Sequence, residues 1–260
     1  MKRIWLKVPR WLRYALVGTA ATFVASAVLV AFAWWYLHPS IERIDGIVYG
    51  ERNGRPLTLD VLKPADPNGI GVAFMVSGGW KSQQPGEAPE LPMAPLLRRG
   101  YTIFAVCHIS QPDSTVMENI EDVNRGVRFI RHHADRYGID PQRIGVAGGS
   151  AGGHLSLMLA TRGGPGPQDA ADPIDRHSSA VQAVAIFYPV TDLLNLGSST
   201  ENPGDGGPPV SYVKAFGPDA RDMEKWKLIG RECSPIYHVS ADLPPTLMCH
   251  GDADTLTPLD

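Results

Sequence analysis

The sequence has few cysteines and no excess of basic residues. Its 260 residues include three scattered cysteines and no C-x-x-C pair, which argues against a disulfide framework, structural zinc or thiol redox chemistry. We expect Cys107, Cys233 and Cys249 to be small buried apolar side chains. The 24 basic and 27 acidic residues leave a formal net charge of −3, which does not favour nucleic-acid phosphates. No nucleic-acid partner is expected.

Cofactor and metal motifs are also absent from the sequence. Neither G-x-G-x-x-G nor G-x-x-x-x-G-K-[ST] occurs, so a dinucleotide or phosphate loop is not predicted. Asp252 and Asp254 form an Asp-x-Asp pair like the start of a calcium loop, but the glycine and the closing glutamate of such a loop are missing. We therefore expect no cofactor and no metal.

An uncharged segment is present near the N-terminus. Residues 14–37 carry no charge, and as a helix they would be about 36 Å long, against a hydrocarbon core of about 30 Å. The first thirteen residues are strongly basic, which favours a cytoplasmic tip. Residues 25–27 resemble a signal-peptidase site, but another apolar run follows, so an uncleaved signal anchor is favoured. The sequence predicts a tip and membrane anchor in residues 1–40 and an extracytoplasmic domain, periplasmic in a bacterium, in residues 41–260.

Strand-like and helical patterns alternate through residues 41–260. Residues 44–49 and 57–62 flank a turn at Asn53-Gly54, which predicts a hairpin. The clearest helix has an apolar stripe from Ile120 to Tyr137. Thr115 and Glu118 fit a capping box at its start, with Asp113 and Ser114 as alternative caps, and Gly138 ends it. Short apolar runs at residues 71–76, 101–106, 144–147, 181–188 and 246–249 predict further strands. This order predicts an α/β fold with a mostly parallel central sheet and helices on both faces.

The motif G-x-S-x-G occurs once in a context that favours catalysis. Gly148, Ser150 and Gly152 follow a strand-like run and precede a helix-forming run. A serine on such a turn is strained with its hydroxyl exposed, and the glycines let the backbone turn tightly. The pattern predicts Ser150 as a nucleophile, the alternative being a glycine turn that serves packing. The backbone amides of Ala151 and Gly79, with Gly78 and Trp80 as neighbours of Gly79, are the predicted oxyanion donors.

These motifs resemble the α/β-hydrolase superfamily. Residues 137–154 are similar to its carboxylesterase branch, which includes hormone-sensitive-lipase-like and bacterial feruloyl-esterase-like enzymes. The resemblance covers about residues 44–260 and implies a serine hydrolase that cleaves small-molecule carboxylic esters through an acyl-enzyme on Ser150. Such families often write the oxyanion loop as H-G-G-G-W, whereas residues 76–80 read Val-Ser-Gly-Gly-Trp and lack the histidine. Trp80 is either an aromatic wall of the substrate site or a core residue.

The resemblance also assigns the catalytic acid. Residues 250–258 fit the family pattern H-G-x-x-D-x-x-V-P except at Thr257, which makes Asp254 the acid that orients the catalytic histidine. In this fold the histidine follows the acid, but all eight histidines precede Asp254. His154, one turn beyond Ser150, should point along its helix rather than at the hydroxyl. We expect a chain truncated before its last strand and histidine loop, with weak turnover. A noncatalytic hydrolase-fold binding protein and a peptidase of the same fold are the alternatives.

Overall fold

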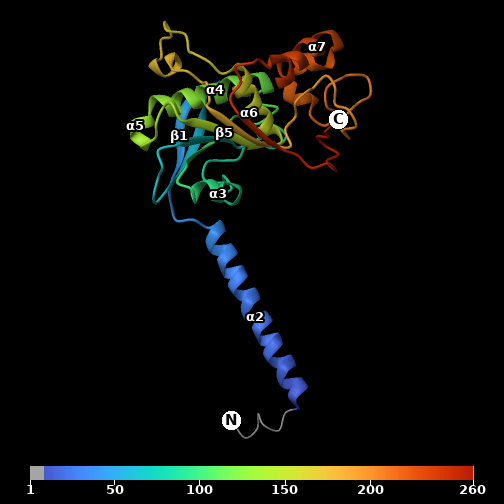
Figure 1. Cartoon of the computed structure of the whole chain (residues 1–260). Helices are drawn as coiled ribbons and strands as arrows, with labels where there is room; N and C mark the ends of the chain where they lie inside the picture. The colour runs from blue at the N-terminus through green and yellow to red at the C-terminus, as the bar shows by residue number, and fades with distance from the viewer. Residues whose placement is uncertain (1–8, 260) are drawn as a thin grey trace.

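A seven-stranded sheet is the centre of the computed structural model, which describes residues 9–259 (Figure 1). The strand order is β1-β2-β4-β3-β5-β6-β7. β1 and β2 form the predicted hairpin, β2 runs antiparallel to β4, and β4, β3, β5, β6 and β7 run parallel to one another. The prediction of a mostly parallel sheet is confirmed. The strands are β1 (Ile41–Arg52), β2 (Arg55–Pro64), β3 (Gly71–Met75), β4 (Thr102–Val106), β5 (Ile144–Gly149), β6 (Ala183–Phe187) and β7 (Thr246–Cys249).

Helices lie on both faces of this sheet. The helices α4 (Val116–His132) and α6 (Ala151–Arg162) cover one face, and the short α3 (Ala94–Leu97) lies on the other (Figure 1). The other helices are α2 (Arg10–Leu37), α5 (Ala134–Tyr137) and α7 (Met223–Glu232), with 3-10 turns at η1 (Leu91–Met93), η2 (Pro173–Arg176), η3 (Val213–Phe216), η4 (Pro218–Arg221) and η5 (Pro235–His238).

The predicted capping box begins α4. The Thr115 hydroxyl accepts a hydrogen bond from the Glu118 amide at 3.3 Å, and the Glu118 carboxylate accepts one from the Thr115 amide at 2.7 Å. The helix does not continue to Tyr137 as the stripe suggested. It stops at His132, because the backbone of His133 leaves the helical region while its ring bonds to the Phe129 carbonyl. A separate turn, α5, then ends at Gly138 with φ +68°.

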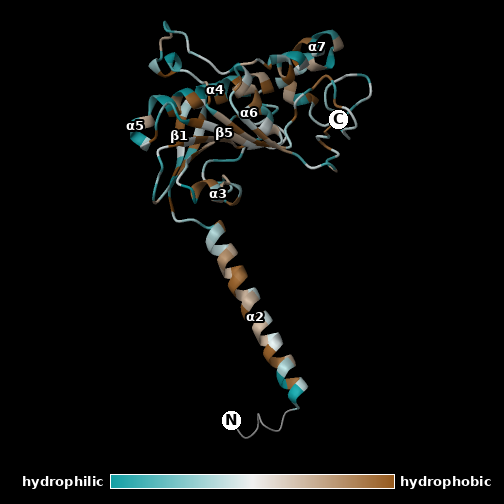
Figure 2. Cartoon of the chain, viewed as in Figure 1, coloured by the Kyte–Doolittle hydropathy of each residue, from teal (hydrophilic) through white to brown (hydrophobic). Residues whose placement is uncertain are grey.

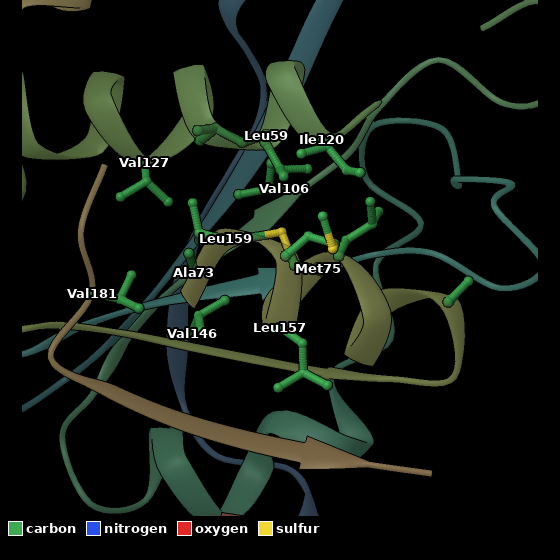
Figure 3. Close-up of a cluster of buried hydrophobic side chains, with 14 of the residues drawn as sticks. Leu59, Ala73, Met75, Val106, Ile120, Val127, Val146, Leu157, Leu159 and Val181 are labelled. Atoms are coloured by element: carbon green, nitrogen blue, oxygen red, sulfur yellow. The ribbon is translucent and has the colours of Figure 1, made fainter. Parts of the chain in front are cut away.

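The larger apolar core lies between the sheet and the helices α4 and α6. Strand side chains from β2 to β5 meet helix side chains there, including Leu59, Met75, Val106, Val146, Ile120, Val127 and Leu159 (Figure 3). This packing fixes the carboxyl ends of β3 and β5 relative to each other. Cys107 and Cys233 are buried as predicted, but the prediction for Cys249 is wrong. Cys249 is exposed because β7 is an edge strand whose residues are all exposed.

The helix α2 projects away from the sheet. Its 28 residues include none that are buried, and it is apolar along most of its length (Figure 2). By length and composition it is a candidate membrane span. The guanidinium of Arg98, just after α3, donates to the backbone carbonyls of Trp35 and of Tyr36 and lies 4.2 Å from the Trp35 ring centroid. These bonds satisfy carbonyls that the end of a helix leaves without partners. The basic residues Lys2, Arg3 and Lys7 lie outside the described residues.

Candidate active site

Ser150 occupies a sharp turn between β5 and α6. Its backbone has φ +53° and ψ −124°, a sparsely populated conformation, and its amide donates to the Phe187 carbonyl at 3.0 Å. The glycines of the motif are required by space. A Cβ on Gly148 would lie 2.5 Å from the Gly152 carbonyl oxygen, and one on Gly152 would overlap the Met75 carbonyl oxygen. The turn is therefore a strained strand-to-helix elbow that presents the serine side chain.

The Ser150 side chain is reachable from solvent. It is partly exposed and lines a pocket at the carboxyl ends of the parallel strands. The pocket walls come from the loop after β3, the loop after β6 and the segment after β7. They include Gly79, Trp80, Ala151, Asp192, Leu196, Ser199, Glu201, Tyr212 and Leu256. An ester carbonyl in this pocket would approach the serine from outside the sheet.

Two backbone amides of residues that line the same pocket as Ser150 have no acceptor among residues 9–259. They are the N–H groups of Gly79 and Ala151, both at the pocket wall. Gly79 has φ +55°, and its added Cβ would lie 2.7 Å from the Tyr212 ring, so only glycine fits. The prediction of Gly78 as a further donor is not supported, because its amide donates to the Lys81 carbonyl at 2.9 Å. Residues 76–82 are called the oxyanion loop below.

The Trp80 ring packs rather than stands free. It is 2% exposed and makes edge contacts with the rings of His154, Tyr212 and Phe216. Its indole N–H donates to Nδ1 of His154 at 3.2 Å, and Nε2 of His154 donates to the Cys233 carbonyl at 2.6 Å. His154 is thus fully buried with both ring nitrogens occupied, so it is a structural residue and not the base for Ser150. Trp80 still lines the pocket, although almost all of the residue is buried.

The burial of His154 predicts a stability loss in acid. Burial lowers its pKa from 6.5 to about 4. Between these values the unfolded chain binds a proton that the folded chain does not, so stability falls as pH drops through this window, by up to about 3 kcal/mol. Above pH 6.5 this contribution is constant. Urea unfolding of the full chain in detergent, followed by tryptophan fluorescence at pH 7.5 and 4.5, measures the loss. His154→Gln should show a smaller loss, and an equal one would contradict the assignment.

Asp254 is held rigidly in the loop after β7. One carboxylate oxygen accepts the amides of Leu256 and Thr257, both at 2.9 Å, and the other accepts the Thr257 hydroxyl at 3.0 Å. The Thr257 amide is the main cause that lowers the pKa of Asp254, which keeps it ionised. Its neighbours Leu256, Thr257 and Pro258 line the pocket that Ser150 lines. Nε2 of His250 lies 3.7 Å from the second carboxylate oxygen.

No histidine ring among residues 9–259 is hydrogen-bonded to Ser150. All eight histidines fall within these residues, and each bonds elsewhere. His250, for example, bonds to the Thr257 carbonyl. Four others bond to backbone carbonyls: His38 to Trp34, His133 to Phe129, His154 to Cys233 and His238 to Glu232. His108 bonds to the Ser77 hydroxyl, and His132 and His177 bond to each other. The structure therefore brings together the predicted nucleophile, the two predicted amide donors and the loop of the predicted acid, and residues 9–259 place no histidine on Ser150.

Comparison with known proteins identifies the family. Residues 59–260 match the BD-FAE family of α/β-hydrolase carboxylesterases. The chain belongs to this family. Among its relatives, the probable carboxylic ester hydrolase LipM of Mycobacterium tuberculosis is 33% identical over 83% of this chain and 49% of its own length. The chain spans about half the length of the curated relatives LipM and LipQ.

Solved esterases share the fold. A truncated carbohydrate esterase from gut microbiota superposes with a TM-score of 0.68 at 23% identity, covering 84% of this chain and 79% of that one. Esterase 2 of Thermogutta terrifontis, solved with butyrate bound, has a TM-score of 0.60 at 28% identity over 86% of this chain and 76% of its own. The predicted α/β-hydrolase fold and carboxylesterase family are thus confirmed.

Sequence reasoning missed Tyr212 as a pocket residue. The Tyr212 ring packs against Gly79 and Trp80. In the sequence, Tyr212 follows the turn-rich loop 197–209. That loop supplies Ser199, Glu201 and Pro209 to the pocket wall. An aromatic residue three positions after a long Gly- and Pro-rich loop was the available signal. Its pairing with the oxyanion loop, more than 130 positions earlier, could not be found without the tertiary structure.

Proposed function

We propose that this protein hydrolyses carboxylic esters of small molecules through an acyl-enzyme on Ser150. The carrying observation is that Ser150, on a strained elbow, lines the same pocket as two backbone amides that have no acceptor among residues 9–259. Ser150 Oγ would attack the ester carbonyl, and the amides of Gly79 and Ala151 would stabilise the oxyanion. The alcohol leaves with a proton, and water then cleaves the acyl-enzyme to release the acid.

Asp254 is the acid of this proposed triad. Its fixed, ionised carboxylate suits the stabilisation of an imidazolium near the pocket. The base is the group that residues 9–259 do not place at Ser150, so we propose weak turnover for the 260-residue chain. That observation also favours the second candidate, a noncatalytic binding protein of the same fold. The two differ in the reactivity of Ser150.

Covalent labelling tests the proposal directly. The full chain in detergent is incubated with an uncharged fluorophosphonate in imidazole buffer, which supplies the base, and is then digested, and the peptides are analysed by mass spectrometry. We expect the adduct on Ser150, since the probe needs a reactive serine beside oxyanion donors. An unlabelled Ser150 in folded protein would support the binding protein. An adduct on another serine would overturn the nucleophile assignment.

The pocket predicts a preference for neutral esters. The described residues that line it include the acidic Asp192 and Glu201 and no lysine, arginine or histidine. An acyl chain ending in a carboxylate should be disfavoured by about tenfold in kcat/KM relative to a neutral chain of equal length, and less so at high salt. Comparison of 4-nitrophenyl butyrate with the mono-4-nitrophenyl ester of glutaric acid measures this. Glu201→Gln should reduce the ratio of kcat/KM for the neutral ester to kcat/KM for the charged ester.

Asp205→Asn is the control for that charge effect. Asp205 lies in the same loop as Glu201 but not in the pocket lining, and asparagine can keep its bond to the Gly207 amide. The ratio of kcat/KM for the neutral and charged esters in Asp205→Asn should match that of the wild type. An unchanged ratio in Glu201→Gln would show that this carboxylate does not select the substrate.

The location of the domain is a further part of the proposal. Residues 1–40 would form a tip and membrane anchor, with the hydrolase domain of residues 41–260 outside the cytoplasm. The apolar α2 and the basic first thirteen residues support this orientation. Protease added to spheroplasts of an expressing bacterium should digest the domain. Protection of the domain in intact spheroplasts would show the opposite orientation, with the domain in the cytoplasm.

A further inference from the structure

The oxyanion loop, residues 76–82, follows an unusual backbone path. Gly79 and Trp80 both have φ +55°, and for tryptophan this conformation is costly, on the order of 1–3 kcal/mol. A loop in such a conformation needs bonds that hold it. Because the proposed donor at Gly79 belongs to this stretch, the surrounding bonds also set where that N–H lies relative to Ser150.

The segment after β4 supplies several of those bonds. The Gln111 amide donates to the Trp80 carbonyl at 3.0 Å, and the Ser82 amide donates to the Ser110 hydroxyl at 3.0 Å. One buried side chain lies in the same segment and reaches the loop. Nε2 of His108 is 2.8 Å from the hydroxyl of Ser77, directly before Gly78 and Gly79.

The protonation of His108 follows from its two partners. Nδ1 lies 2.9 Å from the Ile109 carbonyl oxygen, which can only accept, so Nδ1 carries the proton. Nε2 therefore accepts the hydrogen bond that the Ser77 hydroxyl donates. The ring is 7% exposed, and burial lowers the pKa of His108, which keeps it neutral. A neutral ring of fixed tautomer thus joins the two segments.

Ser77 passes this constraint to the nucleophile elbow. Its carbonyl accepts the amide of Gly152 at 3.1 Å, in the first turn of α6. Gly152 is two residues from Ser150, and the Ala151 amide lies between them. The path from His108 to Ser77 to Gly152 therefore connects the two stretches that carry the proposed donors, Gly79 and Ala151.

We propose that His108 is a positioning residue that holds the Ser77 hydroxyl and thereby fixes the Gly79 amide relative to the Ala151 amide. It places an imidazole from the segment after β4 beside a loop whose own motif lacks a histidine. This inference rests on the proposed function, because it assigns a role in forming that oxyanion site. His108 touches no reacting atom and is not the base.

Two substitutions separate the two bonds of the ring. In His108→Gln the amide oxygen reaches the position of Nε2 and can accept from Ser77, whereas in His108→Asn the shorter amide reaches only Nδ1 and can donate to Ile109. His108→Ala removes both bonds. Ser77→Ala removes the hydroxyl and keeps the carbonyl that accepts from Gly152.

The readout is the rate at which an uncharged fluorophosphonate labels Ser150 in the full chain in detergent. Imidazole in the buffer takes the serine proton, the Oγ–P bond forms, and the P–F bond breaks to release fluoride. The labelling rate is measured at several probe concentrations. The resulting curve gives a maximal rate and the probe concentration at which half of that rate is reached. A displaced oxyanion donor lowers the maximal rate, because the donor acts on the transition state.

We expect His108→Asn, His108→Ala and Ser77→Ala to lower the maximal labelling rate by about 10- to 100-fold. The half-saturating concentration should stay within about twofold, and His108→Gln should keep most of the wild-type rate. The double variant Ser77→Ala/His108→Ala should be no slower than His108→Ala, because that single change already removes the bond between the two side chains. Melting temperatures identify any variant that does not fold, and the remaining ones still decide the outcome.

Two different results would overturn the inference. If wild-type Ser150 is labelled and the folded His108→Asn and Ser77→Ala variants keep its rate, His108 does not position the loop. The same holds if His108→Gln is as slow as His108→Asn. If wild-type Ser150 is not labelled at all, the proposed function fails, and the inference fails with it.

Discussion

Replacing Ser150 with alanine should lower imidazole-supported ester hydrolysis by about 10- to 100-fold and remove fluorophosphonate labelling. The side chain supplies the only atom proposed to bond to the substrate. Alanine keeps the Cβ and the hydrogen bond that the backbone amide of this residue donates to the Phe187 carbonyl, so the elbow should fold as before. Hydrolysis of 4-nitrophenyl butyrate, with melting temperature measured alongside, tests both statements. The rate is measured with imidazole present, because residues 9–259 place no base at the serine.

Ser240→Ala is the matched control for this experiment. Ser240 is exposed and outside the pocket lining, so its loss should change neither turnover nor labelling. If labelling and turnover survive in Ser150→Ala, another group is the nucleophile. In that case the elbow would be a glycine turn that serves packing.

Imidazole should rescue the turnover of the 260-residue chain. The pocket holds a serine and, at its border, a loop with an ionised carboxylate, but no histidine bonded to Ser150 among residues 9–259. A free imidazole can take the serine proton while Asp254 stabilises the imidazolium. We expect millimolar imidazole to raise the Ser150-dependent rate by about 10- to 100-fold, and Asp254→Asn to remove most of that gain. The rate of Ser150→Ala is subtracted, because imidazole itself cleaves activated esters.

The neighbouring carboxylate gives the control for Asp254. Asp252 is exposed, it is not among the pocket-lining residues, and no hydrogen bond within the described part of the chain fixes its carboxylate, so Asp252→Asn should keep the full rescue. Fast turnover without imidazole would mean that a histidine of this chain serves as the base after a rearrangement. Equal rescue in Asp254→Asn would remove this residue from the triad.

Local patterns predicted the elements of the sheet because each strand and helix carries its own signal. The runs at residues 71–76 and 144–147 became β3 and β5, and Thr115 with Glu118 formed the capping box of α4. The predictions that failed concern residues whose burial or hydrogen bonding depends on a partner from another part of the fold, or on the lack of one. Cys249 is apolar enough to be buried, but no other strand or helix among residues 9–259 covers the edge strand β7. The Gly78 amide is next to a proposed donor, yet it bonds to Lys81 across a turn.

By itself, the sequence determined an α/β fold with a mostly parallel sheet and the elbow at Ser150, because hydrophobic period, glycine spacing and turn residues act over a few neighbouring positions. The hydrolase family came from the resemblance of its motifs. Only the tertiary structure decided which side chains complete the surroundings of the serine. It placed His154 under Trp80, Tyr212 against Gly79 and His108 on Ser77. These pairs are 31 to 133 positions apart, and their partners are selected by the way the strands and helices pack, which no local pattern encodes.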